Sequence, residues 1–218
     1  MKITILTLFP DVFTPFLHSS ILGRALKEKY VSIDIVDMRD FATDKHRSVD
    51  DRPYGGGTGM VIRVDIVDRA LQSIRRVFKK QKTRVILLDP RAGIFTQKKA
   101  YSTLRFDHII LICGHYEGVD WRVTTLVDES ISIGRYILTG GEIPALVVTD
   151  CIVRLLPNVL SKPDATVYES FSGHYLYEPP QYTRPKVYKK MRVPRVLLSG
   201  DPKKIAAWKA GFRGEKSS

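Results

Sequence analysis

Three glycine-bearing loops are the part of this sequence best suited to bind a small molecule through backbone atoms. They read LLDPRAG (87–93), LICGHYEG (111–118) and ISIGRYILTGGEIP (131–144), and each contains or follows a strand-like apolar run. None has the glycine spacing of a dinucleotide fingerprint or the Gly-Lys-Ser/Thr ending of a phosphate loop. Backbone N–H and C=O groups can still bind a purine edge between apolar walls. Each loop alone is typical of an ordinary turn, but together they favour a site for an adenosyl group without phosphates.

The segments around these loops predict an α/β fold. Runs rich in Val, Ile and Leu alternate with segments of helical spacing. The predicted strands are residues 2–9, 31–38, 84–89, 108–114 and 131–134, and the predicted helices between them are residues 21–29, 64–78 and 96–105. This alternation is typical of a mostly parallel sheet, in which ligands bind beyond the carboxyl ends of the strands. The three loops occupy those ends.

The remainder of the chain predicts a second, smaller domain. Residues 141–160 read as a long apolar helix that Pro157 bends or ends, so the first domain covers residues 1–160. Residues 161–181 have no clear period and carry Pro, Ser, Gly and aromatic residues, which is typical of a flexible functional linker. Residues 182–218 form a small, basic, mainly helical domain. Its expected helix covers 201–210, with Asp201 as the cap.

The charge of the chain is concentrated in its last segment. The formal net charge is +12, and residues 182–218 hold eleven Lys or Arg against two acidic residues, a surplus of nine. A basic tail on a nearly balanced body favours a phosphate-rich polymer such as a nucleic acid as partner. The alternative is a tail that only adds solubility.

The sequence points to a cytoplasmic protein without a membrane span or a structural metal. Its longest apolar stretches, such as residues 143–148, are far shorter than the ~18 residues of a spanning helix, and the N-terminus lacks the pattern of a signal peptide. Cys113 and Cys151 both have apolar neighbours, so we expect buried free thiols. His115 has no second His or Cys at ligand spacing, and we expect no metal site.

Several longer motifs resemble one known family. They are TDKHRSVDDRPYGGGTGM (43–60), GHYEGVD (114–120), SIGRYILTGGEIPA (132–145), QYTRP (181–185) and VPRVLLSG (193–200). In collinear order over nearly the whole chain, they are similar to the bacterial tRNA (guanine-N1-)-methyltransferases. Members of this family modify the guanosine immediately 3′ of the anticodon.

The resemblance implies a trefoil-knotted α/β methyltransferase domain of the SPOUT superfamily, a homodimer and tRNA as partner. It also implies S-adenosyl-L-methionine as methyl donor, whereas any need for a divalent ion is left open. A knot is a rare exception to the rule that chains do not thread their own loops. The residues that the resemblance places around the adenosyl group are Leu88, Pro90, Gly114, Tyr116, Glu117, Gly118, Ile133, Gly134, Arg135, Tyr136, Ile137, Leu138, Gly140, Gly141 and Pro144.

Methylation of guanine N1 needs a base and a cation. The N1 proton must leave before the nitrogen can attack, and negative charge then builds on O6. The resemblance places the base at Glu169 and the cation at Arg154, with Asp164 as the fallback base. Glu169 is otherwise a solvated linker charge. Arg154 is otherwise a partner of a helix-end carbonyl or of Asp150, four residues earlier.

Further residues are candidates for binding the RNA. The resemblance assigns guanine recognition to the loop that holds His46, Asp50 and Tyr54, where capping or turn roles are the alternative. The triple glycine after Tyr54 predicts a close approach of the backbone to another group. Aromatic candidates for stacking on the target base are Phe171, Tyr175 and Tyr177 in the linker. The family usually continues with another basic stretch, so either some phosphate contacts are missing here or these basic residues make them: Lys203, Lys204, Lys209 and Arg213.

The chain departs from the family pattern at five places. Glu169 stands where an aspartate is common, Arg135 where we expect an aspartate, Trp121 where we expect a glutamate and His115 where we expect an arginine. DPRAG (89–93) replaces S-P-Q-G with one residue more. Two alternatives remain: another knotted methyltransferase that shares the glycine loops but modifies a ribose hydroxyl or another base, and, because of Arg135 and DPRAG, a catalytically idle RNA-binding relative.

Overall fold

The computed structural model describes residues 1–78, 80–162, 165–172 and 177–212. The chain divides into two compact units, Met1–Leu160 and Ser161–Ser218. We call them the N-terminal and the C-terminal unit. The second unit groups residues 161–181 with the basic residues that follow them.

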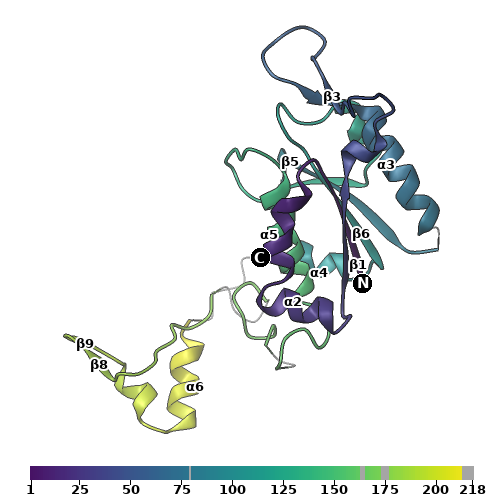
Figure 1. The fold of residues 1–218 in the computed structure, drawn as a ribbon. Helices are drawn as coiled ribbons and strands as arrows, with labels where there is room; N and C mark the ends of the chain where they lie inside the picture. Colours follow the sequence, from purple (N-terminus) through teal and green to yellow (C-terminus); the bar gives the residue numbers. More distant parts are fainter. Residues whose placement is uncertain (79, 163–164, 173–176, 213–218) are drawn as a thin grey trace. The chain divides into compact units, whose positions relative to one another are not determined.

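A five-stranded parallel sheet forms the centre of the N-terminal unit (Figure 1). Its strands are β1 (Lys2–Thr7), β2 (Ser32–Asp37), β5 (Thr83–Ile94), β6 (His108–Cys113) and β7 (Glu129–Ser132), in the order β2-β1-β6-β5-β7. The central strand β6, HIILIC, is buried along its whole length, as expected for a strand covered on both faces. The prediction of a mostly parallel α/β sheet is confirmed, and each strand lies within two residues of its expected start.

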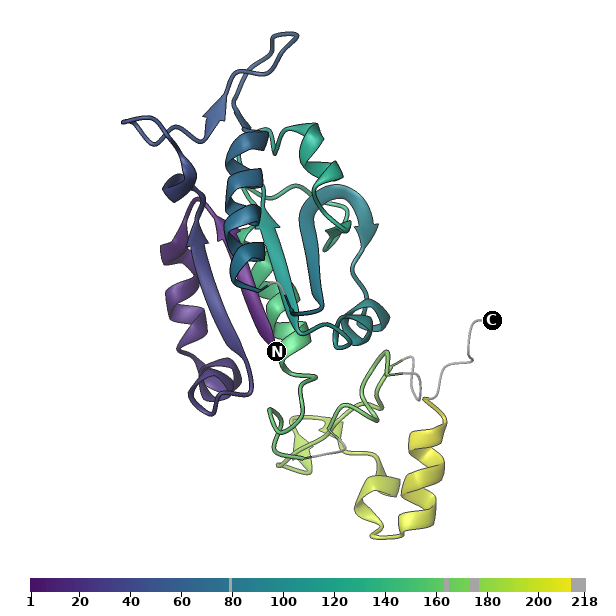
Figure 2. The ribbon, with the colours of Figure 1, turned by 90° about the vertical axis from the view of Figure 1, so that its right-hand side faces the viewer.

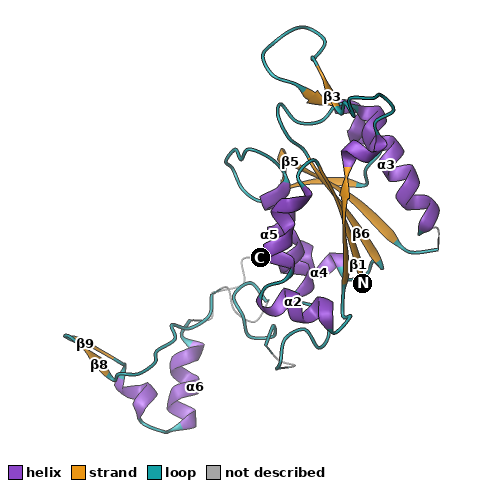
Figure 3. Ribbon diagram, in the orientation of Figure 1, coloured by secondary structure: helices purple, strands orange, loops and turns teal. Residues whose placement is uncertain are grey.

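Helices cover both faces of this sheet (Figures 2 and 3). On one face, α2 (Ser20–Lys27) and α5 (Glu142–Val153) pack in one apolar cluster with Ile109 and Leu111 of β6. On the other face, α3 (Val64–Val77) packs with Ile110 and Ile112 of the same strand. Consecutive residues of β6 therefore enter opposite clusters, as the two-residue period of a strand requires. Helix α4 (Gln97–Thr103) contacts α5.

Short elements complete the N-terminal unit. They are the 3-10 helices η1 (Pro10–Phe13), η2 (Met38–Phe41) and η3 (Trp121–Thr125), the single turn α1 (Thr14–Leu17), and the hairpin strands β3 (Asp50–Asp51) and β4 (Val61–Ile62). The glycines at the tip of this hairpin have positive φ angles, 90° at Gly55, 80° at Gly56 and 118° at Gly57. A Cβ atom on any of them would meet nothing within 4 Å. Within the chain itself, left-handed backbone and not a close neighbour accounts for these three glycines.

Helix α5 is shorter than predicted. It ends at Val153, and Arg154 is its C-cap residue, whereas the sequence pattern continues to residue 160. The physical reason is Pro157. If the helix continued, the proline ring would clash with the carbonyl of Val153, four residues earlier, and proline has no N–H to donate to that carbonyl. Leu155 and Leu156 instead donate their backbone N–H groups to Ile152 and Val153 in tighter turns. None of the described helices has the length and apolar character needed to cross a bilayer.

The C-terminal unit contains one more helix and an unforeseen hairpin. Helix α6 (Pro202–Ala210) begins as predicted, because the Asp201 carboxylate accepts hydrogen bonds from the backbone N–H groups of Lys203 (3.0 Å) and Lys204 (3.2 Å). Strands β8 (Val187–Tyr188) and β9 (Met191–Arg192) form an antiparallel hairpin, followed by the 3-10 helix η4 (Arg195–Leu198).

Candidate active site

A cavity of about 370 Å³ lies at the carboxyl ends of β5, β6 and β7. This volume is in the range of sites for cofactors and drug-sized ligands. Its walls include fourteen of the fifteen residues that the resemblance placed around an adenosyl group: Leu88, Pro90, Gly114, Tyr116, Glu117, Gly118, Ile133, Gly134, Tyr136, Ile137, Leu138, Gly140, Gly141 and Pro144. Arg135 is exposed and is not among the lining residues, so its side chain is not part of the cavity wall.

Two of the glycine loops close on each other to form this cavity. The backbone N–H of Gly141 donates to the carbonyl of Gly114 at 2.7 Å, and His115 forms a bridge with Gly140. A Cβ atom on Gly141 would lie 2.6 Å from the Cα of Cys113 and 2.9 Å from the nitrogen of Gly114. Because these are backbone atoms, only glycine fits there without a shift of the loops.

A buried carboxylate lies beneath the cavity. Glu142, in the first turn of α5, is 6% exposed and accepts a 2.8 Å hydrogen bond from the hydroxyl of Thr7. Its second oxygen lies 3.7 Å from Nδ1 of His115, which lines the cavity. Burial, together with the charge of Glu142, raises the pKa of the Cys113 thiol well above its usual value, so this thiol stays protonated. Cys151, by contrast, is only half-buried.

The charges around the cavity favour a cationic ligand. Asp89 and Arg91 both line the cavity and bind each other, so their charges cancel. Hydrogen bonds from Arg91 lower the pKa of the Asp89 carboxyl, which keeps it ionised. Glu117 in the lining and Glu142 below it then leave an excess of negative charge. Such a site suits a sulfonium better than a phosphate.

The β3–β4 hairpin lies beside the loop 114–120. The N–H of Ile62 donates to the carbonyl of Gly118 (3.0 Å), and the N–H of Glu117 donates to the carbonyl of Met60 (3.0 Å). Asp50 is held by pairing with Ile62 across the hairpin, and Tyr54 is fully exposed near its tip. His46 is exposed in the preceding turn, which Asp44 closes with hydrogen bonds from Ser48. The hairpin thus connects one set of predicted RNA-binding residues to the cavity wall.

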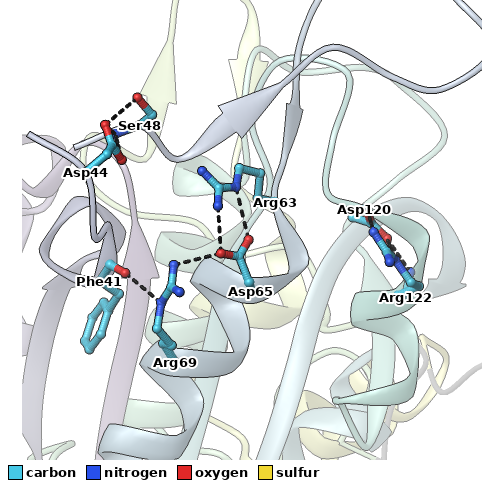
Figure 4. A network of polar contacts seen from close by, with 8 residues as sticks. All are labelled: Phe41, Asp44, Ser48, Arg63, Asp65, Arg69, Asp120 and Arg122. Atoms are coloured by element: carbon cyan, nitrogen blue, oxygen red, sulfur yellow. Dashed lines mark hydrogen bonds and ion pairs between the residues drawn. The ribbon is translucent and has the colours of Figure 1, made fainter. Parts of the chain in front are cut away.

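A charged network fixes the base of this hairpin (Figure 4). Asp65 accepts hydrogen bonds from Arg63, which follows β4, and from Arg69, which also donates to the carbonyl of Phe41. Partial burial raises the pKa of Asp65, but the hydrogen bonds and charges of the two arginines outweigh it and lower the pKa overall. Within the described residues, no three His, Cys, Asp or Glu side chains cluster as metal ligands would.

The two predicted catalytic residues belong to different units. Arg154 ends α5 in the N-terminal unit, and Glu169 lies in the C-terminal unit, where its carbonyl accepts the N–H of Ser172. Within its own unit, Arg154 does not line the cavity. Lys203 and Lys204 are exposed at the start of α6. Asp164, Tyr175 and Arg213 lie outside the described residues.

The sequence reasoning missed one feature of the cavity wall. Asp89 and Arg91 lie in the DPRAG loop, where the predicted strand 84–89 continues as the irregular end of β5. Arg91 binds Asp89 through its backbone N–H (2.9 Å) and through Nε and Nη2 of its guanidinium. The signal was the spacing Asp-x-Arg, which lets one carboxylate accept both kinds of hydrogen bond.

Comparison with known proteins identifies the family. Residues 1–217 match the family described as "tRNA (Guanine-1)-methyltransferase TrmD". A tRNA (guanine-N(1)-)-methyltransferase of Mycoplasmopsis agalactiae is 48% identical over 217 residues, which is 100% of this chain and 93% of that protein. The protein of the same name from Dictyoglomus turgidum is 47% identical over 96% of this chain and 83% of its own length. In Bacillus pumilus the identity is 48%, over 96% of this chain and 85% of that protein. This chain therefore belongs to the tRNA (guanine-1)-methyltransferase family.

Proposed function

We propose that this chain transfers a methyl group from S-adenosyl-L-methionine to N1 of the guanosine immediately 3′ of the anticodon in tRNA. One observation carries the proposal: in a chain that matches this family over residues 1–217, fourteen of the fifteen residues that the resemblance assigns to the adenosyl group line one cavity at the strand ends. The protein would act in the cytoplasm, where tRNA is its substrate.

The residues of the cavity fit the methyl donor. When bound, S-adenosyl-L-methionine supplies a methyl group on a positively charged sulfur. Ile133, Leu138 and Pro144 provide apolar walls for the flat adenine, and the joined loops offer backbone groups to its edge. Glu117 and the buried Glu142 favour the positive charge. We propose that the chain around this site is threaded as the trefoil knot of the superfamily.

In the proposed reaction, Glu169 removes a proton and Arg154 stabilises the negative charge that results. The Glu169 carboxylate takes the proton from guanine N1, and the Arg154 guanidinium stabilises the negative charge that then forms on O6. Glutamate has the same chemistry as the aspartate common in this family and reaches one methylene further. The basic C-terminal unit, including Lys203 and Lys204, binds tRNA phosphates, which fix the register without reading the sequence. His46, Asp50 and Tyr54 contact the guanosine.

We also propose that the active protein is a homodimer. Helix α5 is mostly apolar, with Asp150 as its exposed charge, yet Ile143 and Val147 are 51% and 40% exposed, and Ile137 in the loop before it is 81% exposed. Exposed apolar side chains that gather on one helix face are typical of a protein interface. A second copy of the chain would cover this face.

The test is methyl transfer to an unmodified tRNA transcript with labelled donor, followed by mapping of the labelled nucleoside. We expect 1-methylguanosine immediately 3′ of the anticodon, and no label in a transcript with adenosine at that position. A label on a ribose, on another base, or on no nucleoside at all would refute the proposal.

A further inference from the structure

Two departures from the family pattern meet at one place on the surface. Arg91, in the loop DPRAG, lies over the indole ring of Trp121, with its Cζ atom 4.9 Å from the ring centroid. The two residues are thirty positions apart in the sequence. Trp121 is 67% exposed, and its neighbour Val119 lines the cavity, as Arg91 does. An exposed indole therefore continues the cavity wall onto the surface.

Two arginines near Trp121 are fixed in the same way: Arg91, which lies over its ring, and Arg122, which follows it in the sequence. In Asp89-Pro90-Arg91 the first carboxylate accepts hydrogen bonds from the backbone N–H, Nε and Nη2 of the arginine at 2.9, 3.0 and 2.6 Å. In Asp120-Trp121-Arg122 the same three hydrogen bonds measure 2.9, 3.0 and 2.7 Å. Figure 4 shows the second pair. Both guanidinium groups are thus held in one orientation before any ligand arrives.

This arrangement leaves groups that suit a nucleotide. The Nη1 atoms of Arg91 and Arg122 make no hydrogen bond within the described part of the chain, and the two side chains are 63% and 68% exposed. The fixed orientation lowers the entropy that a phosphate contact would cost. A flat indole beside them can stack on a base of any type. Lone exposed aromatics are common, but one with a fixed arginine over its ring and a second fixed arginine next to it in the sequence matches the aromatic and basic pattern of single-stranded RNA sites.

We propose that Trp121, Arg91 and Arg122 form a site for one unpaired nucleotide of the RNA, next to the nucleotide that enters the cavity. The base stacks on the indole of Trp121, and the adjoining phosphate binds the outer nitrogens of the two arginines. The inference rests on the proposed function, because it takes the methylated RNA as the ligand. No residue of this site is among those that the family resemblance assigns to the RNA.

Fluorescence of a single tryptophan tests the stacking directly. Trp208 is the other tryptophan of the chain. Every protein used in this experiment therefore carries Trp208→Phe, so that Trp121 is the one remaining indole. Unmodified tRNA transcript should quench the emission of Trp121, whereas S-adenosyl-L-methionine alone should not. The double variant Trp121→Phe, Trp208→Phe gives the background signal.

Kinetics in the same background test what the stacking contributes. At saturating donor, Trp121→Leu should raise the KM for tRNA by about 5- to 150-fold with little change in kcat, and Trp121→Phe should raise it less. Arg122→Gln should lower the slope of log KM against log salt concentration by about 0.7, the value expected for the loss of one phosphate contact on a single strand. Arg76→Gln, the same change of charge near the far end of α3, should leave the slope unchanged.

The outcomes separate this inference from the function on which it rests. An unquenched indole, or an unchanged KM for tRNA in Trp121→Leu, would overturn the nucleotide site even if the protein methylates tRNA normally. If Trp121→Leu weakens only the binding of S-adenosyl-L-methionine, measured by calorimetry, the indole merely supports the loop 89–93 and the inference is wrong. Absence of any methylation by the native chain would instead count against the proposed function, while quenching by tRNA would still report the site.

Discussion

The proposed role of Glu169 is to remove the proton of guanine N1. Replacing it with glutamine keeps the size and polarity of the side chain but removes its basicity. We expect Glu169→Gln to bind both S-adenosyl-L-methionine and tRNA nearly normally and to lose about 100- to 10,000-fold in kcat. Glu169→Asp serves as the control and should retain most of the activity. A native kcat in Glu169→Gln would remove this residue from the mechanism.

Gly141 is the glycine that the cavity can least replace. A methyl group at this position would lie within 3.0 Å of the backbone of Cys113 and Gly114, so the two loops must separate. We expect Gly141→Ala to lower the free energy of unfolding by about 1–3 kcal/mol and to weaken donor binding strongly. Thermal melting and calorimetry measure the two effects. The control is Gly93→Ala, where the added methyl group meets nothing within 4 Å. Equal behaviour of the two variants would contradict this account of the loops.

The residues of the cavity could largely be predicted from the sequence, whereas the contacts on its rim could not. Loops that follow apolar strands meet at one edge of a parallel sheet, so their residues gather there whatever the details of packing. The stack of Arg91 on Trp121 joins residues with no shared periodicity or motif. The exposure of Arg135 likewise depends on how one loop turns.

At the scale of elements, the long apolar runs and helical periods were sufficient, and the short elements were not. The six buried residues of β6 leave little choice but a central strand. The hairpin strands β3, β4, β8 and β9 have two residues each, too few to show an alternating pattern. The apolar pattern predicts too long a helix α5, because apolar residues continue past Val153. The proline at 157 nevertheless prevents a helical hydrogen bond to the carbonyl of Val153.

The buried histidine His108, in the central strand β6, should make the stability of the fold depend on pH. His108, at the start of β6, is fully buried, and its Nε2 lies 2.8 Å from the hydroxyl of Thr4. Burial, helped by the charge of Lys2, lowers the pKa of His108 from 6.5 to about 4. Between these values the unfolded chain binds a proton that the folded chain does not. The stabilisation is therefore complete above pH 6.5 and is lost as the pH falls towards 4.

Because of His108, we expect the free energy of unfolding to fall by about 2–3 kcal/mol between pH 7 and pH 4. His108→Gln places an amide nitrogen near the position of Nε2 and does not titrate. Urea unfolding at several pH values measures the effect. Carboxyl groups also titrate in this range, so the informative quantity is the difference in pH slope between native protein and variant. Parallel slopes would show that His108 carries no such linkage.

At the scale of the whole molecule, the length of α5 separates two parts of the proposed active site. Gly141 and Pro144, at the start of the helix, line the cavity at the carboxyl ends of the strands. Arg154 ends the helix about 18 Å away. Leu156, two residues further, lines a hollow with Met1 and Lys2 at the opposite edge of the sheet. One arginine side chain cannot span that distance, so we infer that, in the proposed homodimer, Arg154 serves the cavity of the other copy.

Mixed dimers test this arrangement. A dimer of one Gly141→Ala chain and one Arg154→Ala chain contains one site with a native cavity and a native Arg154, if Arg154 acts across the interface. When the two inactive proteins are refolded together in equal amounts, half of the dimers should be mixed, each with one competent site of two. We expect about a quarter of the native kcat per site. If Arg154 acts within its own chain, every site in the mixed dimer carries a defect and the mixture stays as inactive as its components. The control is a mixture of Gly141→Ala and Glu142→Gln chains. Both changes lie beside the cavity, so neither chain supplies a native cavity and no activity should return. Recovery in this control would show that the rescue does not come from shared sites.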